Sequence, residues 1–353
     1  MRSFEVCTCG EPLQCVEIET PKPQGTEVLL RVLAAGVCHS DLHFWEGSYD
    51  LGSGKKLMLA DRGVKLPLAM GHENAGEVVA FGPDAKGVKV GDRRLVFPWI
   101  GCGTCAVCGR GEEQLCTSPQ FVGVFRPGGY STHLMIPHPR YLLDFGSIPV
   151  EQATPLACAG VTTYGALKKI DAETLRREAV VIVGAGGLGL MCLSILKALK
   201  GRGAIMVDID AKKREAALAA GALAAIDPAA PDAAQQITKA AGGTVWAAID
   251  LVGASSTVQL CIGCLTKGGT LIVVGLFGGD IVLPTPYLPL RALALRGSYT
   301  GSLRELTELV ELVKNAELPY VPTRMRPLEE ANAALDDLRA GRVIGRQLLG
   351  PGG

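Results

Sequence analysis

A glycine-rich segment between an apolar run and a helical stretch constrains the fold most strongly. Residues 179–184 read AVVIVG, and Gly184, Gly186 and Gly189 form a G-x-G-x-x-G pattern that opens the apolar stretch LGLMCLSILKALK. In a strand–turn–helix unit the first glycine permits a tight turn, the second lets a pyrophosphate approach the backbone, and the third packs the helix against the strand. Further apolar runs lie at 204–208, 223–227, 246–253, 270–278 and 294–300. Their alternation with helical patterning predicts an α/β fold built on a doubly wound parallel sheet.

The same region carries the features of a dinucleotide site. Asp208 ends the next apolar run, where a carboxylate accepts hydrogen bonds from ribose hydroxyls and repels a 2′-phosphate, so we expect NAD rather than NADP. Lys213 follows closely enough to reach the same ribose. A glycine-rich turn without a cofactor is the alternative, which the order of strand, glycines, helix, strand and acid disfavours. The predicted cofactor residues here are Gly184, Gly186, Gly187, Leu188, Gly189, Asp208 and Lys213.

The first 150 residues have a different texture. Short β-like runs such as 27–37 and 76–82 are punctuated by glycine and proline, as in an irregular, mainly β region. A chain of 353 residues exceeds the size at which one hydrophobic core usually stops growing, so two domains are expected. Helical stretches around 302–316 and 328–340 and a strand-like VIGRQLL follow, and texture alone does not say which domain they join.

Four cysteines crowd into the segment CGTCAVCGRGEEQLC at Cys102, Cys105, Cys108 and Cys116. Four thiolates at this spacing suit a tetrahedral zinc ion with no open position for a substrate. The segment has few apolar residues with which to bury cysteines, which disfavours a purely structural cluster. An iron–sulfur cluster is a weaker alternative.

Composition excludes several classes of partner. The formal net charge is zero, with 48% hydrophobic and 20% charged residues, so no electrostatic field attracts nucleic acid or anionic lipid. No apolar stretch is long enough to span a bilayer, and the start of the chain lacks a signal-peptide pattern. We therefore expect a cytoplasmic protein whose twelve cysteines are metal ligands, reactive thiols or buried apolar groups rather than disulfides.

A second set of ligand-type residues is scattered along the chain. Cys38 and His39 lie in GVCHSDLH, His72 and Glu73 in GHE, and Cys158 in PLACAGVTTYGAL. Spacing alone does not join them. Taken together, however, GVCHSDLH, GHENAGEVVAFG, the cysteine lobe, PLACAGVTTYGAL, VGAGGLG and IGRQLL resemble the zinc-containing alcohol dehydrogenases of the medium-chain dehydrogenase/reductase family, above all their bacterial and archaeal tetrameric members.

The resemblance covers nearly the whole chain and implies two domains. Residues 1–153 and 298–353 would form a mainly β, GroES-like catalytic domain, and residues 154–297 a Rossmann domain that binds NAD. The active site would lie in the cleft between them. A homo-oligomer is also implied, a tetramer in preference to a dimer.

The resemblance also assigns the scattered residues. It implies that Cys38, His72 and Cys158 bind a catalytic zinc whose fourth position takes water or alcohol. Glu73 and Asp41 would support these ligands, with Asp41 fixing the His72 ring. With the four-cysteine lobe, two zinc ions per subunit are expected.

Ser40 and His43 resemble the family's proton relay, which carries the alcohol proton through a hydroxyl and the cofactor ribose to imidazole and solvent. His39 is similar to the basic residue that touches the cofactor pyrophosphate, and Arg346 to the arginine that reaches it from the last strand.

Other residues remain outside these motifs. We expect Cys261 and Cys264, and likewise Cys7, Cys9, Cys15 and Cys192, to be buried small hydrophobic groups. Trp99 is a candidate liner of the substrate pocket, and Phe44 and Trp45 are candidates to reach the cleft. The glycine-containing loop 46–66 either covers the site or is a surface excursion.

These features predict a reversible, NAD-linked oxidation of primary or secondary alcohols, favouring apolar or aromatic ones, to aldehydes or ketones. A polyol or sugar dehydrogenase of the same kind is the alternative for the substrate. A zinc-free quinone or enoyl reductase would lack Cys38, His72 and the cysteine lobe. A non-catalytic protein that retains the fold is disfavoured by the joint presence of ligands, relay and nucleotide fingerprint.

Overall fold

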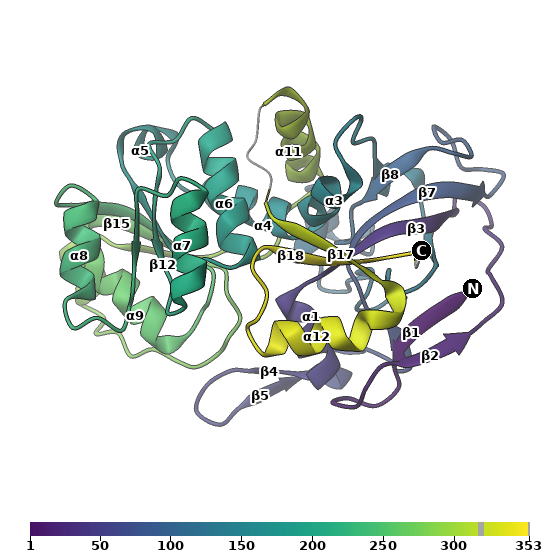
Figure 1. Ribbon diagram of the computed structural model, residues 1–353, viewed down its shortest axis with the longest axis horizontal. Helices are drawn as coiled ribbons and strands as arrows, with labels where there is room; N and C mark the ends of the chain where they lie inside the picture. Colours follow the sequence, from purple (N-terminus) through teal and green to yellow (C-terminus); the bar gives the residue numbers. More distant parts are fainter. Residues whose placement is uncertain (317–320, 352–353) are drawn as a thin grey trace.

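A computed structural model describes residues 1–316 and 321–351 and divides them into two halves that lie side by side (Figure 1). One half is built on a parallel sheet, and the other is built on mainly antiparallel sheets in which only β17 (Thr323–Pro327) and β18 (Arg346–Gly350), among the described strands, pair parallel. No helix among the described residues is long and apolar enough to cross a membrane.

The parallel half contains six strands in the order β13-β12-β11-β14-β15-β16. They are β11 (Val180–Val183), β12 (Ala204–Val207), β13 (Ala224–Ile226), β14 (Val245–Asp250), β15 (Leu265–Val273) and β16 (Ala294–Gly297). Val180 and Ile182 pack into one core cluster while Val181 and Val183 pack into another, because alternate residues of a strand point to opposite faces. A sheet covered on both faces explains the unbroken apolar runs, and the predicted doubly wound sheet is confirmed.

Helices cover both faces of this sheet, with α6, α7, α8 and α9 visible around it in Figure 1. The helices of this half are α5 (Ala172–Arg177), α6 (Gly187–Ala198), α7 (Ala211–Ala219), α8 (Ala233–Ala240), α9 (Ser255–Cys264) and α10 (Tyr287–Arg291).

The other half centres on a sheet in the order β10-β8-β7-β3-β18-β17, to which β9 adds by pairing with β3. Its strands are β3 (Val28–Val37), β7 (Glu73–Phe81), β8 (Arg93–Val96), β9 (His133–Ile136), β10 (Leu142–Leu143), β17 (Thr323–Pro327) and β18 (Arg346–Gly350). A smaller sheet contains β1 (Arg2–Val6), β2 (Gln14–Glu17) and β6 (Leu68–Ala69).

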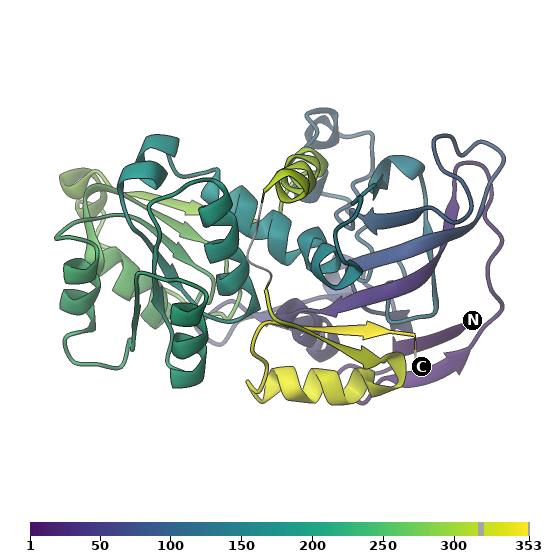
Figure 2. The same ribbon diagram turned by 45° about the horizontal axis from the view of Figure 1, so that its top comes forward.

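The segment after residue 300 returns to the antiparallel half. β18 pairs antiparallel with β3, placing Gln347 opposite Val37 and Leu349 opposite Ala35, and Figure 2 shows this yellow segment beside the purple strands rather than beside the parallel sheet. The sequence texture left this open. The range 298–353 predicted for this part of the catalytic domain includes 317–320 and 352–353, which lie outside the described residues.

Helices connect the halves. α4 is buried along its whole length and contacts both α6 and α11. α11 begins with a capping box in which the Ser302 hydroxyl accepts from the Glu305 N–H at 3.2 Å and the Glu305 carboxylate accepts from the Ser302 N–H at 2.8 Å, a signal readable from the sequence. The remaining helices are α1 (His39–Glu46), α2 (Ala106–Gly109), α3 (Val150–Ala153), α4 (Ala159–Leu167), α11 (Leu303–Asn315) and α12 (Ala331–Arg339), with the 3₁₀ turns η1 (Ala60–Arg62), η2 (Glu113–Leu115), η3 (Pro139–Tyr141), η4 (Thr154–Ala157) and η5 (Leu328–Glu330).

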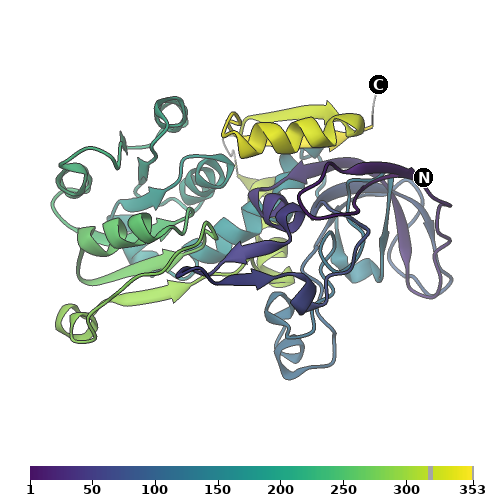
Figure 3. The ribbon, with the colours of Figure 1, turned by 90° about the horizontal axis from the view of Figure 1, so that it is seen from below.

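The loop 46–66 contains a hairpin of β4 (Ser48–Asp50) and β5 (Lys56–Met58). Its tip reaches the parallel half, where the Ser53 hydroxyl bonds to Asp280 and a Cβ at Gly52 would lie 2.7 Å from the backbone of Gly279. Figure 3 shows the hairpin extending from the antiparallel half toward the strands of the other half. The loop therefore bridges the two halves.

The cysteine expectations are partly wrong. Cys192, Cys261 and Cys264 are buried as expected, but Cys9 and Cys15 are exposed and Cys7 is half-buried. The reason is local: Cys9 lies in the connection between β1 and β2, and β2 is an edge strand of the three-stranded sheet.

Candidate active site

Three ligand-type side chains from distant parts of the sequence meet where elements begin or end. Cys38 follows β3 and caps α1, His72 directly precedes β7, and Cys158 lies between η4 and α4. Their ligand atoms lie within 4.8 Å of one another, and all three residues are buried. Two sulfur atoms and one imidazole nitrogen suit zinc, and three protein ligands leave a coordination position open.

Ser40 lies at the edge of this group. Its hydroxyl oxygen is 3.3 Å from the Cys38 sulfur and 3.3 Å from His72 Nε2. A ligand held by the three side chains would therefore find a hydroxyl partner next to it.

Asp41 supports two of the ligands at once. Its carboxylate lies 3.1 Å from His72 Nδ1 and accepts from the Cys38 N–H at 2.9 Å. The Tyr130 hydroxyl also donates to it at 2.9 Å. Because Asp41 faces Nδ1, the imidazole presents Nε2 to the ligand group, as happens in zinc sites where a carboxylate holds the other nitrogen of a histidine ligand.

A buried ion pair connects the site to the parallel half. Arg346 donates to the Glu73 carboxylate, which also accepts from the Ala159 N–H at 3.1 Å. Burial raises the pKa of Glu73 to about 7, against the opposing effect of Arg346. A Cβ at Gly187 would lie 2.5 Å from Arg346 Cδ, so this side chain runs from Glu73 to the first turn of α6.

His43 lies one helical turn beyond Ser40 on α1, toward the surface. Burial lowers the pKa of His43, and the charge of His39 adds to that effect. Its ring packs 4.8 Å from the ring of Tyr49, and Nδ1 lies 3.9 Å from the Glu46 carboxylate. His39 itself is exposed, with its ring 6.1 Å from that of His43.

Aromatic side chains flank His72 on one side. The Trp99 ring centroid is 5.3 Å from that of His72 and 5.4 Å from that of Phe121. Tyr299 completes the group at 6.3 Å from Trp99 and 6.4 Å from Phe121. Trp99 thus lies beside a candidate metal ligand, as a substrate liner must.

Phe44 and Trp45, both expected to reach the cleft, lie in different surroundings. Phe44 packs 6.0 Å from the ring of His72. Trp45 was wrongly expected near the cleft: its indole N–H donates to the Glu11 carbonyl at 2.6 Å, and Arg339 lies over its ring at 5.2 Å. Adjacent helical residues point about 100° apart, so the two rings cannot share one face of α1.

The glycine fingerprint leaves the room that a pyrophosphate needs. Gly184 has φ +97°, and a Cβ at Gly189 would lie 1.9 Å from the Gly184 carbonyl oxygen. A Cβ at Gly186, in contrast, would meet nothing within 4 Å. The α6 N-terminus, which starts at Gly187 and continues through Leu188, offers free N–H groups to an anion there.

Asp208 lies next to this loop. Its carboxylate accepts from the Ala185 N–H at 2.7 Å and from the Asp210 N–H at 2.9 Å. The backbone N–H of Lys213 is bound by the Asp210 carboxylate at 3.3 Å, and among the described residues none pairs with its ammonium group. Asp208 therefore borders the fingerprint, and Lys213 lies in the first turn of α7, next to the loop that carries Asp208.

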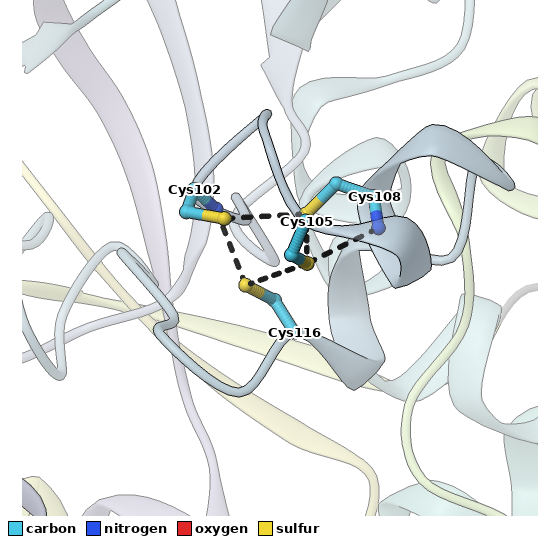
Figure 4. Close-up of side chains that lie close together, drawn as sticks. All are labelled: Cys102, Cys105, Cys108 and Cys116. Carbon is cyan, nitrogen blue, oxygen red and sulfur yellow. Dashed lines mark hydrogen bonds between the residues drawn. The ribbon is translucent and has the colours of Figure 1, made fainter.

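The four-cysteine lobe forms a second, separate ligand group (Figure 4). Its sulfur atoms are 3.5 Å apart for Cys105–Cys108, 3.8 Å for Cys105–Cys116 and 4.0 Å for Cys102–Cys108. A tetrahedron with zinc–sulfur bonds of about 2.3 Å separates its sulfurs by about 3.8 Å, whereas a disulfide needs about 2.05 Å. The lobe therefore fits a closed zinc site.

Four residues near the catalytic group escaped the sequence analysis: Tyr49, Phe121, Tyr130 and Tyr299. Tyr49 lies in the loop after α1, and the other three lie in segments without a ligand motif. Only the position of Phe121 carried a signal, since it opens the apolar FVGVF directly after the cysteine lobe.

Comparisons with known proteins agree with this geometry. Residues 24–145 match the model of the alcohol dehydrogenase GroES-like domain, and residues 187–315 match that of the zinc-binding dehydrogenases. The NAD-dependent alcohol dehydrogenase of Sulfurisphaera tokodaii is 36% identical over 99% of this chain and 100% of its own. The D-arabinose 1-dehydrogenase (NADP⁺) of Saccharolobus solfataricus is 35% identical over 97% and 95%. The crystal structure of the alcohol dehydrogenase of Aeropyrum pernix superposes with a TM-score of 0.88 at 32% identity, covering 99% of this chain and 100% of that one.

Proposed function

The chain belongs to the zinc-containing alcohol dehydrogenases of the medium-chain dehydrogenase/reductase family, and on that premise we propose that it oxidises alcohols reversibly with NAD at the site around Cys38, His72 and Cys158. The observation that carries the proposal is the adjacency of two features. An open three-ligand group lies at one end of the Glu73–Arg346 pair, and the dinucleotide fingerprint lies at the other.

The zinc ligands have distinct roles in this proposal. Cys38, His72 and Cys158 hold a catalytic zinc, and Cys102, Cys105, Cys108 and Cys116 hold a structural one. When bound, the catalytic zinc supplies a Lewis acid that polarises the alcohol oxygen. NAD supplies the hydride acceptor.

The chain's own residues then orient the reactants and move the proton. Ser40 accepts the alcohol proton and at the same time releases its own hydroxyl proton toward His43; its hydroxyl is 3.3 Å from two of the ligand atoms. His43, on the same face of α1 three residues later, delivers it to solvent. Arg346 and the α6 N-terminus hold the pyrophosphate, His39 touches it from the catalytic half, and Asp208 and Lys213 bind the adenosine ribose.

The aromatic group favours an apolar or aromatic substrate. Trp99 and Phe121 are buried beside His72, and the more exposed Tyr299 packs against both. Aromatic rings of this kind favour contact with apolar groups. The indole N–H of Trp99 is already used by the Ala157 carbonyl at 3.2 Å. Aldose substrates, such as the D-arabinose named for one relative, would need several polar partners, whereas the three residues of this group offer only the hydroxyl of Tyr299.

We also propose a cytoplasmic homo-oligomer, a tetramer in preference to a dimer. β16 lies at one edge of the parallel sheet and pairs only with β15 among the described strands. Phe277, Val282 and Leu290 are exposed in the neighbouring segment. An unpaired edge beside exposed apolar groups is a surface that proteins normally cover.

Steady-state kinetics tests the proposal. Benzyl alcohol, cyclohexanol and D-arabinose are offered with NAD⁺ and NADP⁺ to wild type and to Trp99→Ala. We expect turnover of the first two alcohols with NAD⁺ and a higher KM in the variant. Absence of turnover with a fully zinc-loaded enzyme, or a preference for D-arabinose, would contradict it.

A further inference from the structure

The side of the dinucleotide site where β12 and β13 end contains a cation that the proposed function does not use. Arg214, in the first turns of α7, donates through Nη1 to the carbonyl of Asp208 at 2.8 Å and to that of Ile209 at 2.9 Å. The same nitrogen lies 3.1 Å from a carboxylate oxygen of Asp227, directly after β13. Arg214 thus ties the loop that carries Asp208 to the neighbouring strand.

This places the guanidinium close to where an adenosine ribose binds. The Asp208 side chain is fixed to the fingerprint through Ala185 N–H at 2.7 Å, and the Asp208 backbone carbonyl is fixed to Arg214 at 2.8 Å. A ribose that hydrogen-bonds the Asp208 carboxylate would therefore contact the same residue whose backbone carbonyl binds Arg214. In dinucleotide-binding folds an acid at this position binds the ribose 2′-hydroxyl, the group that carries the phosphate in NADP.

Only part of the guanidinium is engaged. Nε and Nη2 of Arg214 have no partner among the described residues, and its side chain is 20% exposed. An arginine fork of this kind binds phosphate oxygens bidentately when its charge is free. Asp227 is the carboxylate that compensates this charge in the structure.

We propose that Asp227 is a specificity-determining residue for the cofactor: by pairing with Arg214, it withholds that cation from a 2′-phosphate and reinforces the selection of NAD by Asp208. The inference rests on the proposed NAD site and extends it, because it assigns part of the discrimination to a residue that lies outside the fingerprint. Removing the Asp227 charge changes the summed formal charge of Asp208, Arg214 and Asp227 from −1 to 0.

A direct measurement of nucleotide binding tests the role of Asp227 independently of catalysis. Calorimetry measures the affinities for adenosine 2′,5′-bisphosphate and for AMP, and their ratio reports what the 2′-phosphate contributes to binding. The measurement is made on wild type, Asp227→Asn and Asp227→Asn/Arg214→Ala. The asparagine oxygen can still accept from the Ala229 N–H, as Asp227 does at 2.9 Å, so the fold of the loop is retained. Because the pair is partly exposed, we expect the ratio to shift toward the bisphosphate by about three- to tenfold in the single variant.

The double variant and a matched control make the result specific. The gain should disappear in Asp227→Asn/Arg214→Ala. Asp336→Asn, which removes an exposed arginine partner on α12, where Asp336 lies 2.8 Å from Arg339, should leave the ratio unchanged.

An unchanged ratio in Asp227→Asn, a gain that survives in the double variant, or an equal gain in Asp336→Asn overturns the inference. Failure of wild type to bind either nucleotide overturns both this inference and the proposed nucleotide site. Nucleotide binding without oxidation of any alcohol overturns the proposed activity alone, because the ratio of the two nucleotide affinities can still be measured.

Discussion

The two cysteine-rich ligand groups differ in how the chain builds them. The four-cysteine lobe is made by fifteen consecutive residues, and three of its four cysteines are partly exposed. The other group takes Cys38, His72 and Cys158 from three separate elements and buries all of them. One group is local and closed, whereas the other is long-range and open.

The surroundings differ in the same way. In the lobe, Cys116 accepts backbone N–H bonds from Cys102 and Ser118, both at 3.3 Å. In the open group, charged side chains surround the ligands: Asp41 beside His72, and the Glu73–Arg346 pair behind them. A closed site needs only a fixed sulfur tetrahedron, whereas an open one needs its ligands held while a fourth partner exchanges.

The largest effect is expected for Cys38→Ser. Losing a ligand of the open group removes the Lewis acid, which contributes several kcal/mol to the transition state, so kcat should fall by about 10³-fold or more. Metal analysis should show one zinc per subunit instead of two, with little change in thermal stability. A variant that keeps both zinc ions and full turnover would refute the assignment of Cys38.

Cys105→Ser should give the opposite profile. A lost structural metal belongs to the class of changes that cost about 4 kcal/mol or more, which lowers the melting temperature by on the order of 10 °C. Zinc content should again fall by one, but kcat measured well below the melting temperature should stay within about threefold. If Cys105→Ser abolished turnover without lowering stability, the division of roles between the two groups would be wrong.

His43→Gln tests the proton path that only the open group has. Burial lowers the pKa of His43, so the imidazole stays neutral and able to accept a proton below its ordinary pKa, and this ability is lost as pH falls through the lowered value. We expect alcohol oxidation in the variant to slow by about 10- to 10²-fold above that pH, with the curves converging at high pH where hydroxide takes the proton. Superimposable pH–rate profiles would make His43 structural, and zinc loss would make it a metal-site residue.

The smallest effect is expected for Glu113→Gln, behind the closed lobe. This carboxylate accepts from the Gly101 N–H at 2.9 Å and from the Tyr141 hydroxyl at 2.8 Å. Replacing it with a neutral amide weakens these two hydrogen bonds, which should lower the free energy of unfolding by about 1–2 kcal/mol. Zinc content and kcat should not change. A drop in kcat comparable to that of His43→Gln would show that the lobe communicates with the active site.

The sequence predicted what is local and missed what depends on packing. The glycine fingerprint and the cysteine lobe each lie within about fifteen residues, and every strand of the parallel sheet is a short apolar run next to a helical stretch. In each case the spacing along the sequence carries the signal. Joining Cys38, His72 and Cys158 required a family resemblance, because no periodicity connects positions so far apart. Four residues were missed and Trp45 was misplaced, since the side of a helix or loop that faces the site is set by the elements packed around it. The missed residues are Tyr49, Phe121, Tyr130 and Tyr299.

The pairing of β18 with β3 has a consequence for how the protein is made. Residues 28–158 supply the zinc ligands of both groups, but within the part of the chain that the structure describes, residues 347–349 alone pair with the edge of β3 that ends at Val37. A chain emerging from the ribosome therefore carries an open strand edge beside Cys38 until roughly three hundred more residues have been added, those between Cys38 and Gln347. The same late segment brings Arg346, so the nascent enzyme is both inactive and exposed to wrong strand pairing during most of its synthesis.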